Sequence, residues 1–283
     1  MFIFTIIPLI SVHAEVIMDG SLGQPINING PHYQIQPEYG KQAGTNLFHS
    51  FEQFNINHDE SANFIVSGDI ENIISRITGG EPSHIDGLIR STLQGTYTTS
   101  KANLFLLNPF GIVFSENASL NIGGSFHAST ADYLKLGIND KFYSSPIESE
   151  VLSTSPPQAF GFMDDTIGDI LFEGQGEIAV EEYRNSGLHV NNNQTISLIG
   201  GNIDISKGTF FYDVFNQGNI NQGSLTAPAG NINLVAAAST GEVLLKNNEL
   251  DISAIHQLGS ISIADFSLID VSGELGGNVR IRA

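Results

Sequence analysis

Residues 103–128 read NLFLLNPFGIVFSENASLNIGGSFHA, and this stretch sets the pattern of the chain. A first apolar run, 103–107, ends at the turn sequence NPFG (108–111), and a second apolar run, 112–114, leaves on the other side. A third short strand and a Gly-Gly pair follow. Pro109 presets the first central angle of the turn, and Phe110 disfavours a left-handed conformation. We predict a type I turn between the two strands, in which Gly111 takes any positive φ.

An internal repeat extends this pattern through the C-terminal third. Glycine, polar, apolar, polar, apolar occurs at 201–205, 230–234, 259–263 and 277–281, with 176–180 as an earlier copy. The starting glycines are 25, 29, 29 and 18 residues apart, the differences between their numbers. Such spacing predicts a solenoid in which every turn adds one strand to the same sheet, because a stack of strands shares an interior that one strand cannot enclose.

Alternation along these strands predicts which side chains form the interior. We expect the apolar residues to point inward and the Asn, Asp, Ser and Arg between them to face water. The inward set is Ile203, Ile205, Ile232, Leu234, Ile261, Ile263, Val279 and Ile281. A β-sandwich is the structural alternative, but the repeat recurs in phase with similar glycine corners, which favours the solenoid.

Composition agrees with an all-β chain. The 283 residues include 30 glycines, with 41% hydrophobic and 14% charged residues, and no window shows sustained helical periodicity. Only residues 46–54 can be read at either a helical or a strand period. The net charge of −19 and the scattered distribution of 11 basic residues argue against nucleic acid or an anionic membrane as a partner.

The N-terminus and the lack of cysteine indicate export. Residues 1–14 have an apolar core and end in Val12-His13-Ala14, which predicts a signal peptide cut before Glu15. No Lys or Arg precedes the apolar core, so we expect a truncated start; a buried N-terminal strand is the alternative. Without cysteine, stability comes from packing and backbone pairing, which suits a chain that crosses membranes unfolded.

Three segments are expected in the chain. Residues 1–14 are the signal peptide, 15–135 an N-terminal cap and secretion domain, and 136–283 the coils of the solenoid. A loop excursion is predicted near 136–158, where Ser144-Ser145-Pro146 and Pro156-Pro157 interrupt the periodicity. Because the sequence stops within a repeat, we expect the chain to continue in a longer protein.

Five motifs, taken in order, resemble a known family. They occupy 46–55, 74–80, 85–89, 103–112 and 121–126. In this order they resemble the N-terminal secretion domain of filamentous haemagglutinin-like exoproteins, the exported members of two-partner secretion systems. The third position of the turn differs, because the family typically has Asn-Pro-Asn-Gly and this chain has Phe110.

The resemblance implies a fold, partners and a location. The fold is a right-handed single-stranded parallel β-helix with an N-terminal β cap. The partners are the Sec translocon, an Omp85-type outer-membrane transporter of two-partner secretion, and a host or neighbouring cell surface. The full product is a haemagglutinin-like adhesin with a haemagglutination activity domain, exported through the periplasm and secreted or held at the outer cell surface. Residues assigned to transporter recognition are Asn108, Pro109, Phe110, Gly111, Asn46 and Arg76.

Neither catalysis, a cofactor nor a metal is predicted. The eight histidines are scattered, and the acidic pairs Asp164-Asp165 and Glu181-Glu182 are expected to be solvated loop carboxylates. One alternative is a β-helical polysaccharide lyase or hydrolase, which would recruit Asp204, Asn233 and Arg280 from outward positions of the repeat. Another is a purely structural matrix protein.

Overall fold

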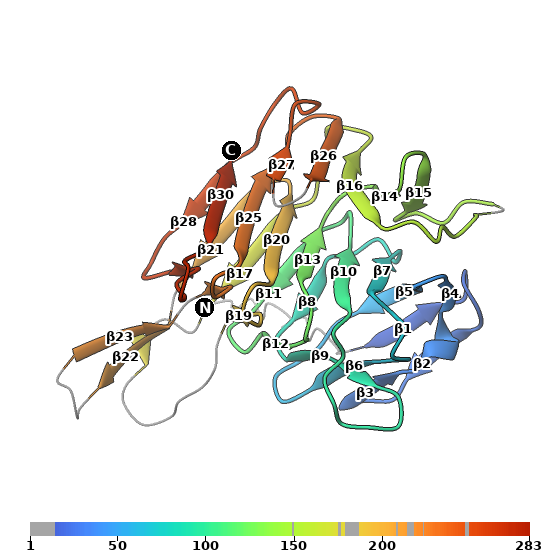
Figure 1. Cartoon of the computed structure of the whole chain (residues 1–283), viewed down its shortest axis with the longest axis horizontal. Coiled ribbons are helices and arrows are strands. Elements are labelled where there is room, and N and C mark those ends of the chain that lie inside the picture. The colour runs from blue at the N-terminus through green and yellow to red at the C-terminus, as the bar shows by residue number, and fades with distance from the viewer. Residues whose placement is uncertain are drawn as a thin grey trace, which may run out of the picture.

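The computed structural model describes residues 15–148, 150–174, 177–178, 187–207, 209–213, 218–222, 224–246 and 249–283. These residues form β-strands and one short 3-10 helix, η1 (Pro37–Tyr39). Figure 1 shows the strands stacked in coils from the blue N-terminal end to the red C-terminal end. Among the described residues, no helix has the length and hydropathy of a membrane span. The predicted signal peptide lies outside the described residues.

Each coil contributes strands to three faces. The first face is a parallel run of β5 (Asn46–Phe54), β7 (Asn72–Ile77), β10 (Asn103–Leu107), β13 (Phe126–Ser129), β20 (Thr195–Gly200), β25 (Asn231–Ala236) and β30 (Asn278–Arg282). The second is β8 (Ser83–Ile85), β11 (Ile112–Phe114), β17 (Ile170–Glu173), β21 (Ile203–Ser206) and β28 (Ile261–Ile263), also parallel. The prediction of a parallel β-helix is confirmed.

The third face consists of two parallel sheets. One holds β3 (His32–Ile35), β6 (Ser61–Val66), β9 (Leu88–Leu93) and β12 (Ser119–Asn121), and the other holds β19 (Leu188–His189), β24 (Leu225–Thr226) and β29 (Ile269–Asp270). A parallel bridge between Ser119 and Gly187 joins them. Residues 103–128 therefore contain a whole coil, because β10, β11 and β12 supply one strand to each face and β13 begins the next coil.

The prediction that every repeat copy joins one sheet is wrong. Ile203 pairs with Ile261 on the second face, whereas Ile232 pairs with Val279 on the first. The glycine pattern marks the entry to a strand of either face, because its copies precede β21 and β28 on the second face and β25 and β30 on the first. The copy at 176–180 is only partly described; its strand β18 (Glu177–Ile178) pairs with β22 (Thr209–Asp213), outside the three faces. A hairpin of β22 and β23 (Gly218–Gln222) projects from the coils (Figure 1).

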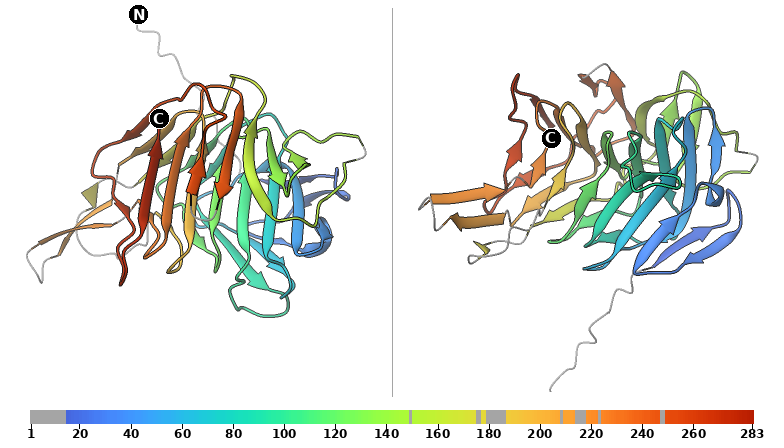
Figure 2. Two further views of the ribbon diagram at one scale, coloured as in Figure 1. Left: turned by 45° about the horizontal axis from the view of Figure 1, so that its top comes forward. Right: turned by 60° about the horizontal axis from the view of Figure 1, so that its bottom comes forward.

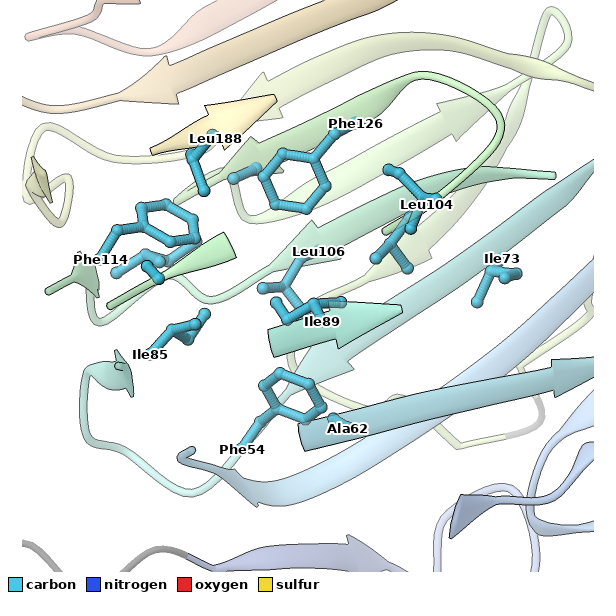
Figure 3. Close-up of a cluster of buried hydrophobic side chains, with 14 of the residues drawn as sticks. Phe54, Ala62, Ile73, Ile85, Ile89, Leu104, Leu106, Phe114, Phe126 and Leu188 are labelled. Carbon is cyan, nitrogen blue, oxygen red and sulfur yellow. The ribbon is translucent and has the colours of Figure 1, made fainter. Parts of the chain in front are cut away.

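The interior between the faces is a continuous apolar core. Figure 3 shows Leu104, Leu106, Phe114 and Phe126 pointing into it from successive strands. In the predicted inward set, Ile203, Ile205, Ile232 and Leu234 are buried. Ile261 and Ile263 lie on β28, the last described strand of the second face, and Val279 and Ile281 lie on β30, the last described strand of the first face. All four are partly exposed, with Val279 at 41%. Burial of about 25 cal/mol per Å² of apolar surface makes this core the main stabilising contribution.

A second layer covers the outside of the first face. It is an antiparallel sheet of β15 (Asp140–Tyr143), β14 (Tyr133–Leu136), β16 (Pro157–Phe162), β26 (Gly241–Lys246) and β27 (Glu249–Asp251), called here the covering sheet (Figure 2). It shields outward side chains such as Phe105. The prediction that Asn231 and Asn233 face water is wrong, because both are buried. The boundary expected at residue 135 falls inside β14. Within the predicted excursion, residues 137–139, 144–148 and 150–156 lack a strand.

The N-terminal edge of the first face carries the cap. β1 (Val16–Asp19) and β4 (Lys41–Ala43) both pair antiparallel with β5, and β2 (Pro25–Ile28) pairs with β1. The ambiguous segment 46–54 is therefore a strand, whose Leu47 and Phe51 point into the core while Phe48 packs under the covering sheet. Because unpaired strand edges aggregate, the cap protects this end of the solenoid.

Candidate functional site

The NPFG sequence makes the corner between the first and second faces. The amide of Gly111 donates to the Asn108 carbonyl at 3.2 Å, and the amide of Phe110 donates to Asn108 Oδ1 at 3.0 Å. Gly111, not Phe110, takes the positive φ, 125°. The bond from residue 111 back to residue 108 and the lack of a positive φ at Phe110 are the features expected of a type I turn.

Asn108 connects this corner to the coils on both sides. Its side-chain amide donates to the carbonyl of Glu81 and to Ser83 Oγ, both at 3.0 Å, and its backbone amide donates to the carbonyl of Ser129 at 2.9 Å. Asn108 has no exposed surface, while the side chain of Phe110 is 45% exposed. In the folded domain, an external partner can touch Phe110 but not the side chain of Asn108.

The strands beside the corner have no free edges. β10 lies between β7 and β13, and β11 lies between β8 and β17. Addition of a partner strand requires unpaired backbone groups. A partner can therefore pair with 103–114 only while the coils are open.

Arg76 is buried at the centre of a second polar cluster. Its Nε donates to Ser50 Oγ at 2.7 Å, and its Nη2 donates to Ser21 Oγ at 3.1 Å. Nη1 contacts the carbonyl of Tyr143 at 2.7 Å and Glu150 Oε2 at 2.8 Å, with Arg76 fully buried and the Glu150 side chain 7% exposed. The guanidinium carbon also lies 4.5 Å from the centre of the Phe142 ring.

Asp19 extends the Arg76 cluster into the cap. Its Oδ2 accepts hydrogen bonds from Ser50 Oγ at 2.6 Å and Thr78 Oγ1 at 3.0 Å. Burial raises the pKa of Asp19, but the hydrogen bonds from Ser50, Ser21 and Thr78 outweigh it and hold this pKa below its usual value. Burial lowers the pKa of Arg76, and Glu150 opposes that change. Arg76 pairs with Glu150, and Asp19 accepts hydrogen bonds from Ser50 and Thr78, so each of the three charged groups has a partner.

Asn46 begins a polar ladder along the outside of the first face. Its Nδ2 donates to the carbonyls of Ser153 and Ser155 at 3.0 and 2.8 Å, and its Oδ1 accepts from Asn72 Nδ2 at 2.9 Å. Side-chain or backbone hydrogen bonds then continue from coil to coil. The ladder comprises Asn46, Asn72, Asn103, Ser125, Thr195, Asn231 and Asn278.

The six residues assigned to recognition thus belong to two separate groups. Asn108, Pro109, Phe110 and Gly111 form the corner, while Asn46 and Arg76 lie under residues 143–155. Sequence reasoning missed Glu150 and Asp19. Glu150 is 74 residues from Arg76 in a segment predicted as a loop, so no local pattern connects the two.

The residues that an enzyme would recruit do not share one surface. Asn233 and Arg280 are partners on the first face, where Asn233 is buried, and Asp204 lies exposed on the second. Within the described residues, no group of three or more His, Asp or Glu is placed to bind a metal. Asp164 accepts a hydrogen bond from the Thr166 amide in its own turn, and Glu181-Glu182 lie outside the described residues.

The chain matches a known protein family. A family model described as TPS secretion domain matches residues 14–281, nearly the whole chain. No curated protein matches the chain.

Proposed function

The chain belongs to the TPS secretion domain family, which makes it part of a secreted two-partner secretion exoprotein, and we propose that an Omp85-type outer-membrane transporter recognises residues 103–114 before the coils close. The burial of Asn108 is the observation that carries this proposal. A transporter that reads the Asn108 side chain must meet the chain unfolded. Folding then hides the recognised residues and leaves Phe110 partly exposed.

Strand addition supplies the recognition chemistry. An open 103–114 segment offers the backbone groups of two apolar runs, and a strand of the transporter can pair with them. Main-chain hydrogen bonds give affinity, and alternate side chains such as Leu104 and Leu106 give selectivity. Closure of β10 between β7 and β13 replaces these bonds with bonds inside the domain and so releases the transporter.

The remaining functions follow from the family. The Sec translocon delivers the chain to the periplasm, and the transporter carries it across the outer membrane. The cap of β1, β2 and β4 gives later coils a template on which to stack. The full product is an adhesin that contacts a host or neighbouring cell surface, which cell-binding assays with the secreted protein can test.

The experiment must separate recognition from folding, because Asn108 serves both. The chain is co-expressed with its transporter in a Gram-negative host, and the protein in the medium, on the cell surface and in the periplasm is measured. The Asn108→Ala and Pro109→Ala double variant should accumulate in the periplasm. Ser83→Ala removes a folded-state partner of Asn108 and leaves 103–114 intact, so this control should still be secreted.

Two outcomes contradict the proposal. Normal secretion of the double variant removes the corner from recognition. Equal retention of the Ser83→Ala variant, with equal loss of stability, assigns the defect to folding alone.

A further inference from the structure

We propose that residues 144–156, called here the strap, close over the N-terminal coils late in folding and fix them in place. The strap connects β15 to β16, and its described residues, 144–148 and 150–156, contain no strand. The order of folding proposed for the strap does not require a transporter. Only its consequence for export rests on the proposed function.

The strap and the residue before it supply about half of the polar partners of two buried side chains. Arg76 receives Ser50 and Ser21 from the first coils, but the carbonyl of Tyr143 and the carboxylate of Glu150 come from this later segment. Asn46 donates its Nδ2 hydrogens only to the strap carbonyls of Ser153 and Ser155. Asn46 and Arg76 therefore lack part of their hydrogen-bond partners until the strap packs over them.

Sequence separation makes this arrival a late event. The hydrogen bonds to Tyr143 and Glu150 span 67 and 74 residues, and those from Asn46 span 107 and 109. Contacts within the first face between β5 and β7 span 26 residues, as in Asn72 to Asn46. Because the entropy of loop closure grows with loop length, neighbouring coils close before the strap does.

The packing under the strap favours reversible opening. A cavity of about 480 Å³ lies between the strap and the cap, lined by Leu22, Ala43, Arg76, Glu150 and Leu152 among others. Ile147 and Val151 of the strap are 51% and 80% exposed. A segment with few buried apolar contacts opens at low free-energy cost. The Arg76 to Glu150 ion pair and the two hydrogen bonds from Asn46 are thus the contacts that hold the strap on the first coils.

Export gives the late closure a consequence. In an extended chain, 67 residues span roughly 220 Å, far more than the ~40 Å thickness of a membrane. Arg76 and Glu150 can meet only when both are on the same side. The first coils can therefore stack on one another, but the strap cannot fix them until it has crossed.

Pulse-labelling hydrogen exchange during refolding of the full chain tests the order of events. The amides of β7 and β10 should become protected before the Ser155 amide of the strap, which donates to Ser153 Oγ. A second measurement compares unfolding rates of Glu150→Gln with those of Glu148→Gln, an exposed neighbour in the same loop. Glu150→Gln should unfold at least about tenfold faster and refold at the parent rate, because its contact forms after the transition state.

Three results would overturn the inference. The strap amides could gain protection as early as β10, Glu150→Gln could slow refolding instead of accelerating unfolding, or it could behave like Glu148→Gln. None of these measurements involves a transporter, so none of them tests the recognition proposal. The secretion experiment, in turn, does not test the order in which the strap closes.

Discussion

The corner at Asn108 and the cluster around Arg76 both hide a polar side chain completely, but they are assembled in different ways. Asn108 reaches partners only 25 and 27 residues away, on the coil below it. Arg76 needs partners 67 and 74 residues away, from a segment outside the coils. The first arrangement follows once two coils stack in register. The second depends on a separate closing event, and it buries a charge instead of a neutral amide.

Of the changes considered, removal of the buried charge of Arg76 should lower the stability of the domain most. Arg76→Met leaves Glu150 enclosed without its cation, and it should lower the free energy of unfolding by about 3–5 kcal/mol. Urea denaturation followed by circular dichroism measures the loss. The double variant Arg76→Met and Glu150→Leu should recover part of it, and Lys41→Met, an exposed cation in the cap, serves as the control. Strictly additive losses would show that the two side chains do not stabilise each other.

Acid should lower the free energy of unfolding of the first face, which both regions adjoin. Burial lowers the pKa of His49 and of His127 to about 4, whereas an unfolded histidine titrates near 6.5. The unfolded chain therefore binds more protons, and stability falls as the pH drops from 6.5 toward 4, by up to about 3 kcal/mol for each histidine. His127→Phe keeps the stack on Phe105 and should remove about half of this dependence in urea titrations at several pH values. His58→Gln, on the surface, should retain it.

The corner should respond less strongly than the Arg76 cluster. Asn108→Ala leaves the carbonyl of Glu81 and Ser83 Oγ without their donor, and it should cost about 1–3 kcal/mol. Ser83→Ala should cost less, because the Asn108 amide keeps the Glu81 carbonyl. A loss at Asn108 as large as that at Arg76 would mean that the corner, like the cluster, depends on distant segments.

The smallest effect should be a difference in pH dependence between the two regions. The pKa of Asp19 is lowered in the folded state, so its stabilising contribution is present above the unfolded pKa near 3.9 and is lost as the pH falls through the folded value. Asp19→Asn should therefore cost about 1 kcal/mol at pH 7 and less at pH 3. The cost of Asn108→Ala should be the same at both pH values, since the corner partners of its side chain do not ionise.

Local sequence pattern explains which parts of the fold could be predicted. The type I turn follows from Pro109 and Gly111, and strand alternation predicts inward residues such as Ile203 and Ile232, because both depend on neighbours in the chain. The assignment of repeat copies to one sheet failed, since a glycine before an apolar pair marks any corner. The covering sheet joins β14 and β15 to β16 and to the distant β26 and β27, and the pairing of Arg76 with Glu150 crosses 74 residues. No short-range signal encodes either.

The ladder from Asn46 to Asn278 bears on how such a chain can change in length. Between Asn72 and Asn103 the chain takes 31 residues to return to the ladder, and between Ser125 and Thr195 it takes 70, yet the rungs meet in both cases. Each hydrogen bond of the ladder holds its strand in register with the strand before it. An insertion at a corner therefore does not shift the register of the coils that follow. Relatives of this domain can therefore acquire or lose whole surface hairpins in evolution while the scaffold beneath them keeps its dimensions.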